Sequence, residues 1–206
     1  MRRTPLRILI SGRALTFEIG KDVYEPSDDS FLLAGCVSKF ASGRVLDMGT
    51  GCGIQAIIAA QKSNSIVAAD ISKPALECAK KNAAANGVAG KIEFRESNLF
   101  SNFLPNEKFD TIIFNPPYLP TANEEKTSGI LDAAWNGGRD GRKIIDAFLN
   151  QFPPYLSDSG KLLLLHCHLA DTDKTIRLLE HNGFKVEILD KTLAGNEALC
   201  VIKAVK

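Results

Sequence analysis

From residue 44 onward, short and almost continuously apolar runs alternate with helical patterns, and this alternation constrains the fold more than any other feature. Such runs predict strands at 44–47, 66–70, 91–95, 110–114 and 161–166. Strands that are apolar on both faces need cover on both, as in a parallel sheet with helices on each side. The sequence therefore predicts a doubly wound α/β fold.

Helical patterns occupy the intervals between these strands, and predict helices at 54–62, 73–86, 141–152 and 171–181. Two further runs, 185–189 and 198–205, are separated by a short loop around Gly195 and Asn196. A connection this short predicts an antiparallel hairpin at the C-terminal end of the sheet.

The N-terminal part has a different pattern. Two β-like runs, 7–10 and 13–19, predict a hairpin. A helix is expected over 28–40, with Ser27 as its N-cap and acidic residues in its first turn. The polar, glycine-containing stretch 119–138 predicts a long loop.

Length and charge limit the possible functions. With 206 residues, we expect one domain over 1–206, with a hairpin and helix over 1–43 and the core over 44–206. The net charge of +1 argues against nucleic-acid binding through bulk charge, although a local basic patch stays possible.

Cysteine usage and hydrophobicity indicate where the protein acts. The five cysteines form no C-x-x-C pair, and the sequence has no long apolar stretch. Both features predict a cytoplasmic protein that does not span a membrane.

A glycine-rich turn follows the strand at 44–47, which ends in Asp47. Its pattern is G-x-G-x-G over 49–53, and glycines there permit a tight turn and close approach of a ligand. Asp70 closes the next strand, about where a carboxylate meets ribose hydroxyls in nucleotide-binding sheets. A dinucleotide fingerprint would read G-x-G-x-x-G. Asp47 would also repel a phosphate, so the turn is more compatible with a cationic ligand.

Asn115-Pro116-Pro117-Tyr118 lies directly behind an apolar strand. Its two prolines lack N–H donors and restrict φ, so the segment can hold its acceptors rigidly. The Asn115 side chain and the Pro116 carbonyl could accept both N–H bonds of a planar amino group, with Tyr118 packed on its plane. Orientation and charge placement can supply much of the barrier for so poor a nucleophile. An ordinary turn after a strand is the alternative interpretation.

These motifs resemble the class I S-adenosylmethionine-dependent methyltransferases, which implies a Rossmann-like sheet of seven strands. By position, the resemblance assigns Asp47, Gly49, Gly51 and Gly53 to the methionine end of the cofactor and Asp70 to its ribose.

The same resemblance implies an adenine site. Ile71 would lie against the adenine, and Asn98 and Leu99 align with the adenine-contacting turn of the family. That turn usually carries Asp where this chain has Asn98, but an amide oxygen can still accept from the adenine amino group. Asn115 is also expected to contact the cofactor.

Asn-Pro-Pro-Tyr is typical of enzymes that methylate planar nitrogen, both adenine N6 methyltransferases and HemK-like glutamine methyltransferases. Segment 23–33 resembles the N-terminal helix of the archaeal and eukaryotic HemK-like branch, and Ser30 falls where that branch contacts the cofactor. Segment 134–141 resembles its Trp-x-Gly-Gly-x-x-Gly loop. The resemblance therefore assigns four residues to the substrate: Asn115, Pro117, Tyr118 and Trp135.

This resemblance implies N5-methylation of the glutamine in the Gly-Gly-Gln motif of a class I translation termination factor. Asn115, Pro116 and Tyr118 would be the catalytic residues. Members of the branch commonly act with a small zinc-binding activator protein. Two other enzymatic possibilities stay open, an adenine or guanine amino methyltransferase acting on RNA or DNA and a protein-lysine methyltransferase.

A non-catalytic cofactor-binding subunit is a further alternative, against which the intact Asn115 motif argues. His166-Cys167-His168 could suggest a metal site, but no third or fourth ligand group accompanies the histidines. We therefore expect no metal.

Overall fold

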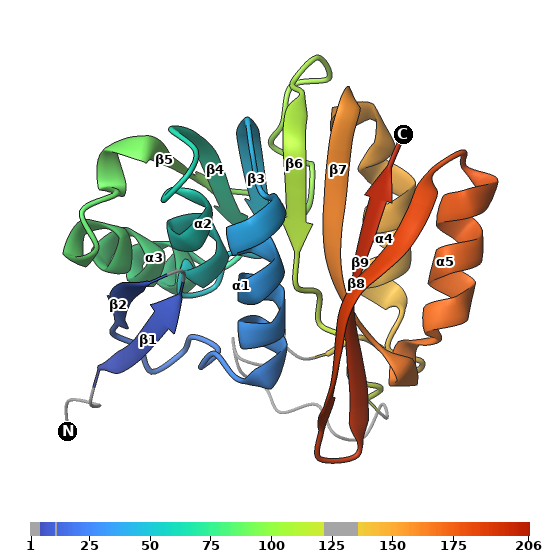
Figure 1. The fold of residues 1–206 in the computed structure, drawn as a ribbon, viewed down its shortest axis with the longest axis horizontal. Coiled ribbons are helices and arrows are strands. Elements are labelled where there is room, and N and C mark those ends of the chain that lie inside the picture. Colours follow the sequence, from blue (N-terminus) through green and yellow to red (C-terminus); the bar gives the residue numbers. More distant parts are fainter. Residues whose placement is uncertain (1–4, 11, 122–135) are drawn as a thin grey trace.

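The computed structural model describes residues 5–10, 12–121 and 136–206. Its main sheet consists of β3 (Arg44–Met48), β4 (Ser65–Asp70), β5 (Ile92–Glu96), β6 (Phe109–Phe114), β7 (Leu156–Cys167), β8 (Lys185–Ala194) and β9 (Glu197–Val205). The seven strands lie in the order β5-β4-β3-β6-β7-β9-β8 (Figure 1). Strands β3 to β7 pair in parallel, whereas β9 is antiparallel to β7 and to β8. The predicted α/β sheet with a C-terminal antiparallel hairpin is confirmed.

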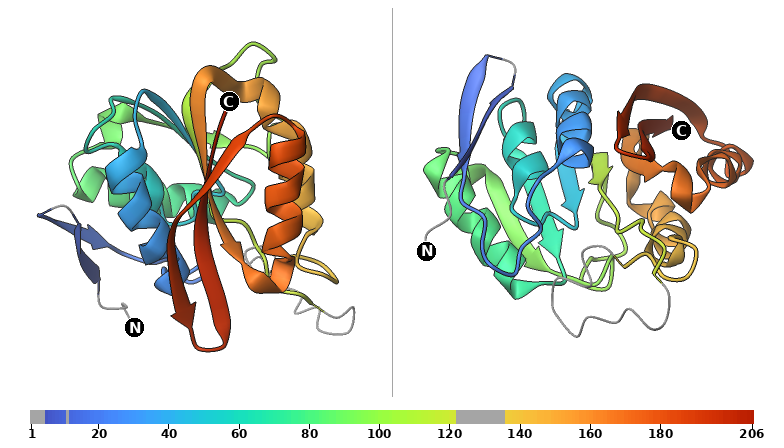
Figure 2. Two further views of the ribbon diagram at one scale, coloured as in Figure 1. Left: turned by 45° about the vertical axis from the view of Figure 1, so that its right-hand side comes forward. Right: turned by 90° about the horizontal axis from the view of Figure 1, so that it is seen from below.

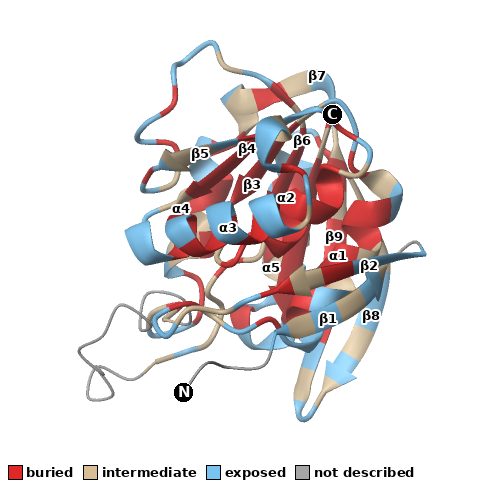
Figure 3. Cartoon of the chain, turned by 90° about the vertical axis from the view of Figure 1, so that its left-hand side faces the viewer, coloured by how far each residue is buried: buried red, intermediate tan, exposed pale blue. Residues whose placement is uncertain are grey.

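Helices cover both faces of this sheet (Figure 2). They are α1 (Asp28–Phe40), α2 (Ile54–Ala59) and α3 (Lys73–Ala85) on one face, and α4 (Lys143–Gln151) and α5 (Thr172–His181) on the other. Alternate residues of a strand therefore enter different cores. In β6, Ile113 packs with the first set of helices, and Ile112 and Phe114 pack with the second. Figure 3 shows the buried residues gathered on the sheet and on the sides of the helices that face it. None of the described helices is long and apolar enough to cross a membrane.

The N-terminal hairpin consists of β1 (Leu6–Ile10) and β2 (Arg13–Phe17), which are antiparallel. Two asparagines, one in α3 and one at its C-cap, bind the backbone of β2 and of the residue that follows it through their side-chain amides. Asn86 exchanges two hydrogen bonds with the backbone of Thr16, at 3.0 and 2.8 Å. Asn82 does the same with Glu18, at 2.8 and 3.1 Å, and its Nδ2 also donates to the carbonyl of Cys52 at 2.9 Å. The hairpin is thereby tied to the glycine turn.

Several predicted element bounds were wrong. The largest difference is in β7, which begins at Leu156 rather than at residue 161. Leu156 pairs with Phe109 of β6, and the polar residues Ser157-Asp158-Ser159-Gly160 follow it. Regular pairing resumes at Lys161, opposite Thr111, after a shift in register. Strand β8 extends to Ala194 rather than 189, because pairing with β9 continues through its exposed half. Differences of two or three residues affect three other elements: β2 ends at Phe17, α2 ends at Ala59, and α4 spans Lys143–Gln151. Most of the remaining bounds differ by no more than one residue.

The buried side chain of His166 makes the free energy of unfolding depend on pH. The ring is fully buried, and its Nε2 and Nδ1 lie 2.9 Å from Thr175 Oγ1 and the Cys167 carbonyl. Burial lowers the pKa of His166 to about 4. Because the unfolded imidazole, with a pKa of about 6.5, binds a proton first, the stability contributed by His166 is complete above that value and lost as the pH falls toward 4.

We therefore expect the free energy of unfolding to fall by about 2 kcal/mol more in the wild type than in His166→Gln between pH 7.5 and 5. Urea unfolding of both proteins across this range measures the difference. Burial raises the pKa of Asp47 to about 7, but Asp47 titrates in both proteins and so cancels in the comparison. Parallel pH profiles for the two proteins would contradict the assignment.

Candidate active site

A cavity of about 700 Å³ lies at the carboxyl ends of β3, β4 and β6. The chain places β4 and β5 on one side of β3 and then returns to place β6 on the other. Doubly wound sheets bind ligands where the strand order reverses in this way. The glycine turn after β3 and the Asn-Pro-Pro-Tyr segment after β6 both line the cavity. The two segments that the sequence singles out are therefore brought together at one edge of the sheet.

Asn115 is held by a carboxylate from α1. Its Nδ2 donates to Asp29 Oδ2 at 3.1 Å, across 86 positions of sequence. Asp29 as a residue is only 4% exposed. Its other carboxylate oxygen accepts from Tyr24 Oη, Ser27 Oγ and Ser30 Oγ, each at 3.0 Å, and from the Ser30 amide. These bonds fix the carboxylate, and the carboxylate fixes the Asn115 amide.

With its nitrogen bound to Asp29, Asn115 turns its oxygen away from that carboxylate. Asn115 Oδ1 is buried and has no hydrogen-bond partner among the described residues. A buried acceptor without a partner is unfavourable in a folded protein. Pro116 and Pro117 follow it in the cavity wall and contribute no N–H. The arrangement suits a ligand that donates N–H bonds.

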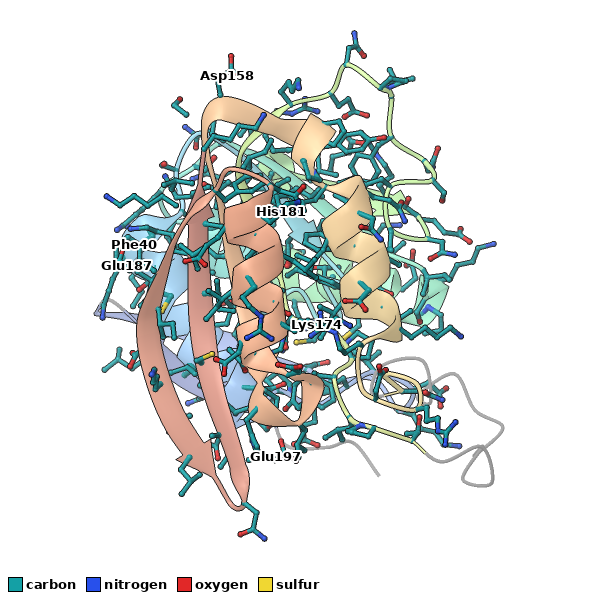
Figure 4. All side chains as sticks on the ribbon, turned by 90° about the vertical axis from the view of Figure 1, so that its right-hand side faces the viewer. Phe40, Asp158, Lys174, His181, Glu187 and Glu197 are labelled. Carbon is teal, nitrogen blue, oxygen red and sulfur yellow. The ribbon has the colours of Figure 1, made fainter. Side chains whose placement is uncertain are left out.

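Tyr118 completes this wall of the cavity. Its hydroxyl donates to Glu197 Oε2 at 3.3 Å. Glu197 begins β9, and the hairpin of β8 and β9 extends past the carboxyl edge of the sheet (Figures 1 and 4). Burial, with the nearby carboxylates of Asp29 and Glu197, raises the pKa of Tyr118 above its ordinary range. The Tyr118 hydroxyl therefore stays protonated, and its ring offers a neutral face to the cavity.

The glycine turn divides into residues that line the cavity and residues that support it. Gly49 and Gly51 line it, both with positive φ, and a Cβ on Gly51 would meet no atom within 4 Å. Asp47 and Gly53 do not line it. Asp47 Oδ2 accepts from Thr50 Oγ1 at 2.6 Å and from an α2 amide at 3.0 Å, which closes the turn. A Cβ on Gly53 would lie 3.0 Å from Ala79 Cβ, so Gly53 allows α2 to pack against α3.

Asp70 ends β4 beside this turn. Its Oδ2 accepts from the Gly51 amide at 2.9 Å and its Oδ1 from the Ser72 amide at 2.8 Å. Burial raises the pKa of the Asp70 carboxyl, while these amide hydrogen bonds oppose the shift. Each carboxylate oxygen can accept more than one bond. Asp70 lines the cavity and so can also receive hydroxyl groups from a ligand.

Beyond Asp70 the cavity wall becomes apolar. Ile71 is 57% exposed and presents its aliphatic side chain to the cavity. Leu99 has a φ of +47°, a left-handed conformation that non-glycine residues adopt at some cost. Asn98 is exposed next to it, and all three residues line the cavity. A flat, apolar ligand group would fit between these side chains.

The glycine loop that precedes α4 runs back along the Asn-Pro-Pro-Tyr segment. The Gly137 amide donates to the Leu119 carbonyl at 3.0 Å. A Cβ on Gly141 would lie 2.3 Å from the Tyr118 carbonyl oxygen, so only glycine permits this approach. Asn136 lines the cavity. Trp135, predicted to contact substrate, lies outside the described residues.

Sequence patterns missed three residues of this site. The sequence indicates for Asp29 only an acidic residue in the first turn of a helix, and for Ser27 the N-cap of that helix. Ser27 occupies the N-cap position, but its side chain makes no capping bond and binds Asp29 instead. Gln55 and Glu197 carry no motif of their own, and neither was predicted. The one signal that the sequence offers is that Asp29 directly precedes Ser30, within the segment that resembles a family motif.

The charges around the cavity are mainly negative. Among the described lining residues the acids are Asp22, Asp29, Asp70 and Glu197, and the one cation is Lys143. This balance favours a positively charged ligand over a phosphate.

The two histidines of the His166-Cys167-His168 segment are bound elsewhere. His166 contacts Thr175, and His168 Nδ1 accepts from the Ala198 amide at 3.0 Å. Over residues 5–10, 12–121 and 136–206, no three His, Cys, Asp or Glu side chains are grouped so as to hold a metal ion.

Comparison with known proteins shows what this chain resembles. A family model described as a methyltransferase small domain matches residues 26–194. A putative protein N5-glutamine methyltransferase of Methanocaldococcus jannaschii is 40% identical over 198 residues, which cover 96% of this chain and 98% of that protein. A release factor glutamine methyltransferase of Neisseria gonorrhoeae is 34% identical, covering 95% of this chain and 73% of that protein.

A solved structure has the same fold. It is the Mtq2–Trm112 complex of E. cuniculi, described as responsible for methylation of the eRF1 translation termination factor. The TM-score is 0.68 at 24% identity, and the match covers 90% of this chain and 99% of that chain.

Proposed function

The chain belongs to the methyltransferase small domain family and, within it, to the HemK-like protein-glutamine methyltransferases, and on this premise we propose that it binds S-adenosylmethionine and methylates a glutamine side chain. The observation that carries the proposal is the fixed Asn115 amide, whose buried oxygen lacks a hydrogen-bond partner within the part of the chain that the structure describes. Such an oxygen fits an acceptor that bears N–H bonds, as a glutamine amide does.

The residues of the cavity fit this cofactor. Asp70 would accept the ribose hydroxyls, and the apolar surface of Ile71 and Leu99 would cover the adenine. Asn98 would accept from the adenine amino group, as its amide oxygen allows. The mainly acidic lining suits a cation. Bound S-adenosylmethionine would supply a methyl group on a positively charged sulfur.

The residues of the Asn-Pro-Pro-Tyr segment would have different roles in methyl transfer. Asn115 Oδ1 and the Pro116 carbonyl would accept the two N–H bonds of the substrate amide, so that its nitrogen faces the methyl group. Tyr118 would pack on the amide plane and exclude water. No base is required first, because the nitrogen attacks with its lone pair while both protons are still bound. The methylated nitrogen would then give up one proton, which passes to solvent water as the product leaves the cavity.

Asn115 Oδ1 would contribute one part of the acceleration, about 100- to 1,000-fold for one fixed hydrogen-bonding group, and the wider arrangement of the cavity would orient the two reactants. Holding two reacting groups in a productive geometry can lower a barrier by roughly 7–11 kcal/mol. Asp29 would be a positioning residue, since it touches Asn115 rather than the substrate. Asp47 and Gly53, expected to contact the cofactor, would instead support the turn that does.

For the substrate, we propose a glutamine of a class I translation termination factor. The names of the Methanocaldococcus and Neisseria relatives support a glutamine and a release factor, respectively. By analogy with the Mtq2–Trm112 complex, this chain would act with a small activator subunit.

The direct test is methyl transfer from labelled S-adenosylmethionine to a termination factor of the same organism, with and without a candidate activator subunit. The expected result is label on the native factor and none on a factor in which the Gly-Gly-Gln glutamine is replaced by methionine. Equal labelling of both factors would overturn the site of methylation. Label on RNA instead, lost as salt is raised, would favour a nucleic-acid amino methyltransferase.

A further inference from the structure

Gln55, the second residue of α2, is a buried polar side chain that neither the fold nor the proposed mechanism explains. It is 3% exposed and lines the cavity. Its Nε2 donates to the Ser30 carbonyl of α1 at 2.9 Å, and its Oε1 is buried without a partner among the described residues. A leucine or methionine could fill the same position without leaving a buried acceptor unsatisfied.

The bond to α1 determines which ligand group Gln55 can bind. The Ser30 carbonyl can only accept, so the amide must direct its nitrogen there and its oxygen elsewhere. Oε1 can then accept a hydrogen bond but cannot donate one. A carboxylate is therefore excluded as its partner, and an ammonium, a hydroxyl or a water molecule remains.

The position of Gln55 in the cavity indicates which of these three groups would bind its Oε1. Gln55 and Asn115 both bind the first turn of α1, at Ser30 and Asp29. Asp70 and Ile71, to which the nucleoside is assigned, follow β4 on the far side of the glycine turn. A cofactor with its ribose at Asp70 and its reactive end at Asn115 would carry its remaining arm, the amino acid, toward α1. The donor on that arm is the α-ammonium group.

We propose that Gln55 Oε1 accepts a hydrogen bond from the α-ammonium group of the cofactor, and that Gln55 is therefore a cofactor-binding residue specific for its amino-acid end. This inference rests on the proposed function, since it takes S-adenosylmethionine as the ligand. It adds a contact that the glycine-turn pattern does not contain, because Gln55 lies beyond the last glycine of that turn.

The test compares two ligands that differ in the amino-acid arm. S-adenosylhomocysteine carries it, whereas methylthioadenosine has the same nucleoside and sulfur without it. Calorimetry would measure both dissociation constants for the wild type and for Gln55→Met, which keeps the side-chain volume and removes the acceptor. Gln151→Met, on the exposed end of α4, is the matched control.

We expect Gln55→Met to weaken S-adenosylhomocysteine binding by at least about tenfold, as for a lost hydrogen bond to a charged group. Methylthioadenosine binding should change less than about threefold, and Gln151→Met should change neither. An equal loss for both ligands would overturn the inference, because Gln55 would then act through the shape of the cavity. An unchanged affinity for both would assign Oε1 to a buried water molecule and would also overturn it. If the wild type bound neither ligand, the proposed function itself would fail.

Discussion

Replacing Asn115 by alanine should slow methyl transfer by roughly 100- to 1,000-fold, the effect of removing one fixed hydrogen-bonding group from an active site. The substitution removes the buried Oδ1 that receives the substrate amide, and it leaves the cofactor wall formed by Asp70 and Ile71 in place. The affinity for S-adenosylhomocysteine should therefore stay within about threefold of the wild type. Single-turnover rates and calorimetry measure the two quantities separately.

Asp70→Ala is the matched control, because the opposite pattern is expected. Loss of the ribose acceptor should raise the dissociation constant by about tenfold or more, while transfer at saturating cofactor is far less affected. If Asn115→Ala lowered affinity and left the single-turnover rate intact, Asn115 would be a cofactor residue and not the acceptor for the substrate amide.

Replacing Asp29 by asparagine should lower the rate of methyl transfer by about 10- to 100-fold, although Asp29 lies behind Asn115. The aspartate accepts from Tyr24, Ser27 and Ser30 with one oxygen and from Asn115 with the other. An asparagine has the same size but only one acceptor oxygen, so one of its sides must present N–H groups to other donors. The Asn115 amide then loses its fixed direction.

A double-mutant cycle distinguishes positioning from an independent effect. If Asp29 acts only through Asn115, adding Asp29→Asn to Asn115→Ala should slow the reaction little further. Asp28→Asn, on the exposed side of the same helical turn, should leave the rate within about twofold. Additive losses in the double variant would mean that Asp29 contributes by a route that does not pass through Asn115.

The fold was predictable because its determinants are local. A strand that is apolar on both faces is recognisable within five or six residues, and the alternation of strands with helices leaves few topologies. The polar start of β7 and the exposed half of β8 lack that signal. Residues 157–160 lie in a register shift between two paired positions of β6 and β7, and the exposed half of β8 is held in the sheet by its pairing with β9. Pairing depends on the partner strand and is not recognisable in the segment itself.

The candidate site was predictable where one motif supplies both position and chemistry, as for Asn115 and Asp70. It was not predictable where a contact joins distant segments. Asp29 meets Asn115 across 86 positions, and Glu197 meets Tyr118 across 79. Asp47 shows a different limit, because a motif locates a carboxylate at a strand end without indicating whether it faces the ligand or the turn.

The most direct test is a crystal structure of this protein with S-adenosylhomocysteine. We expect the adenine against Ile71, the ribose hydroxyls on Asp70, and the sulfur directed toward Asn115. Asn115 Oδ1 would then lie close enough to the sulfur for a bound amide nitrogen to face it. A nucleoside bound away from Asp70, or a sulfur directed away from the Asn-Pro-Pro-Tyr segment, would contradict the proposal that donor and amide acceptor meet in this cavity.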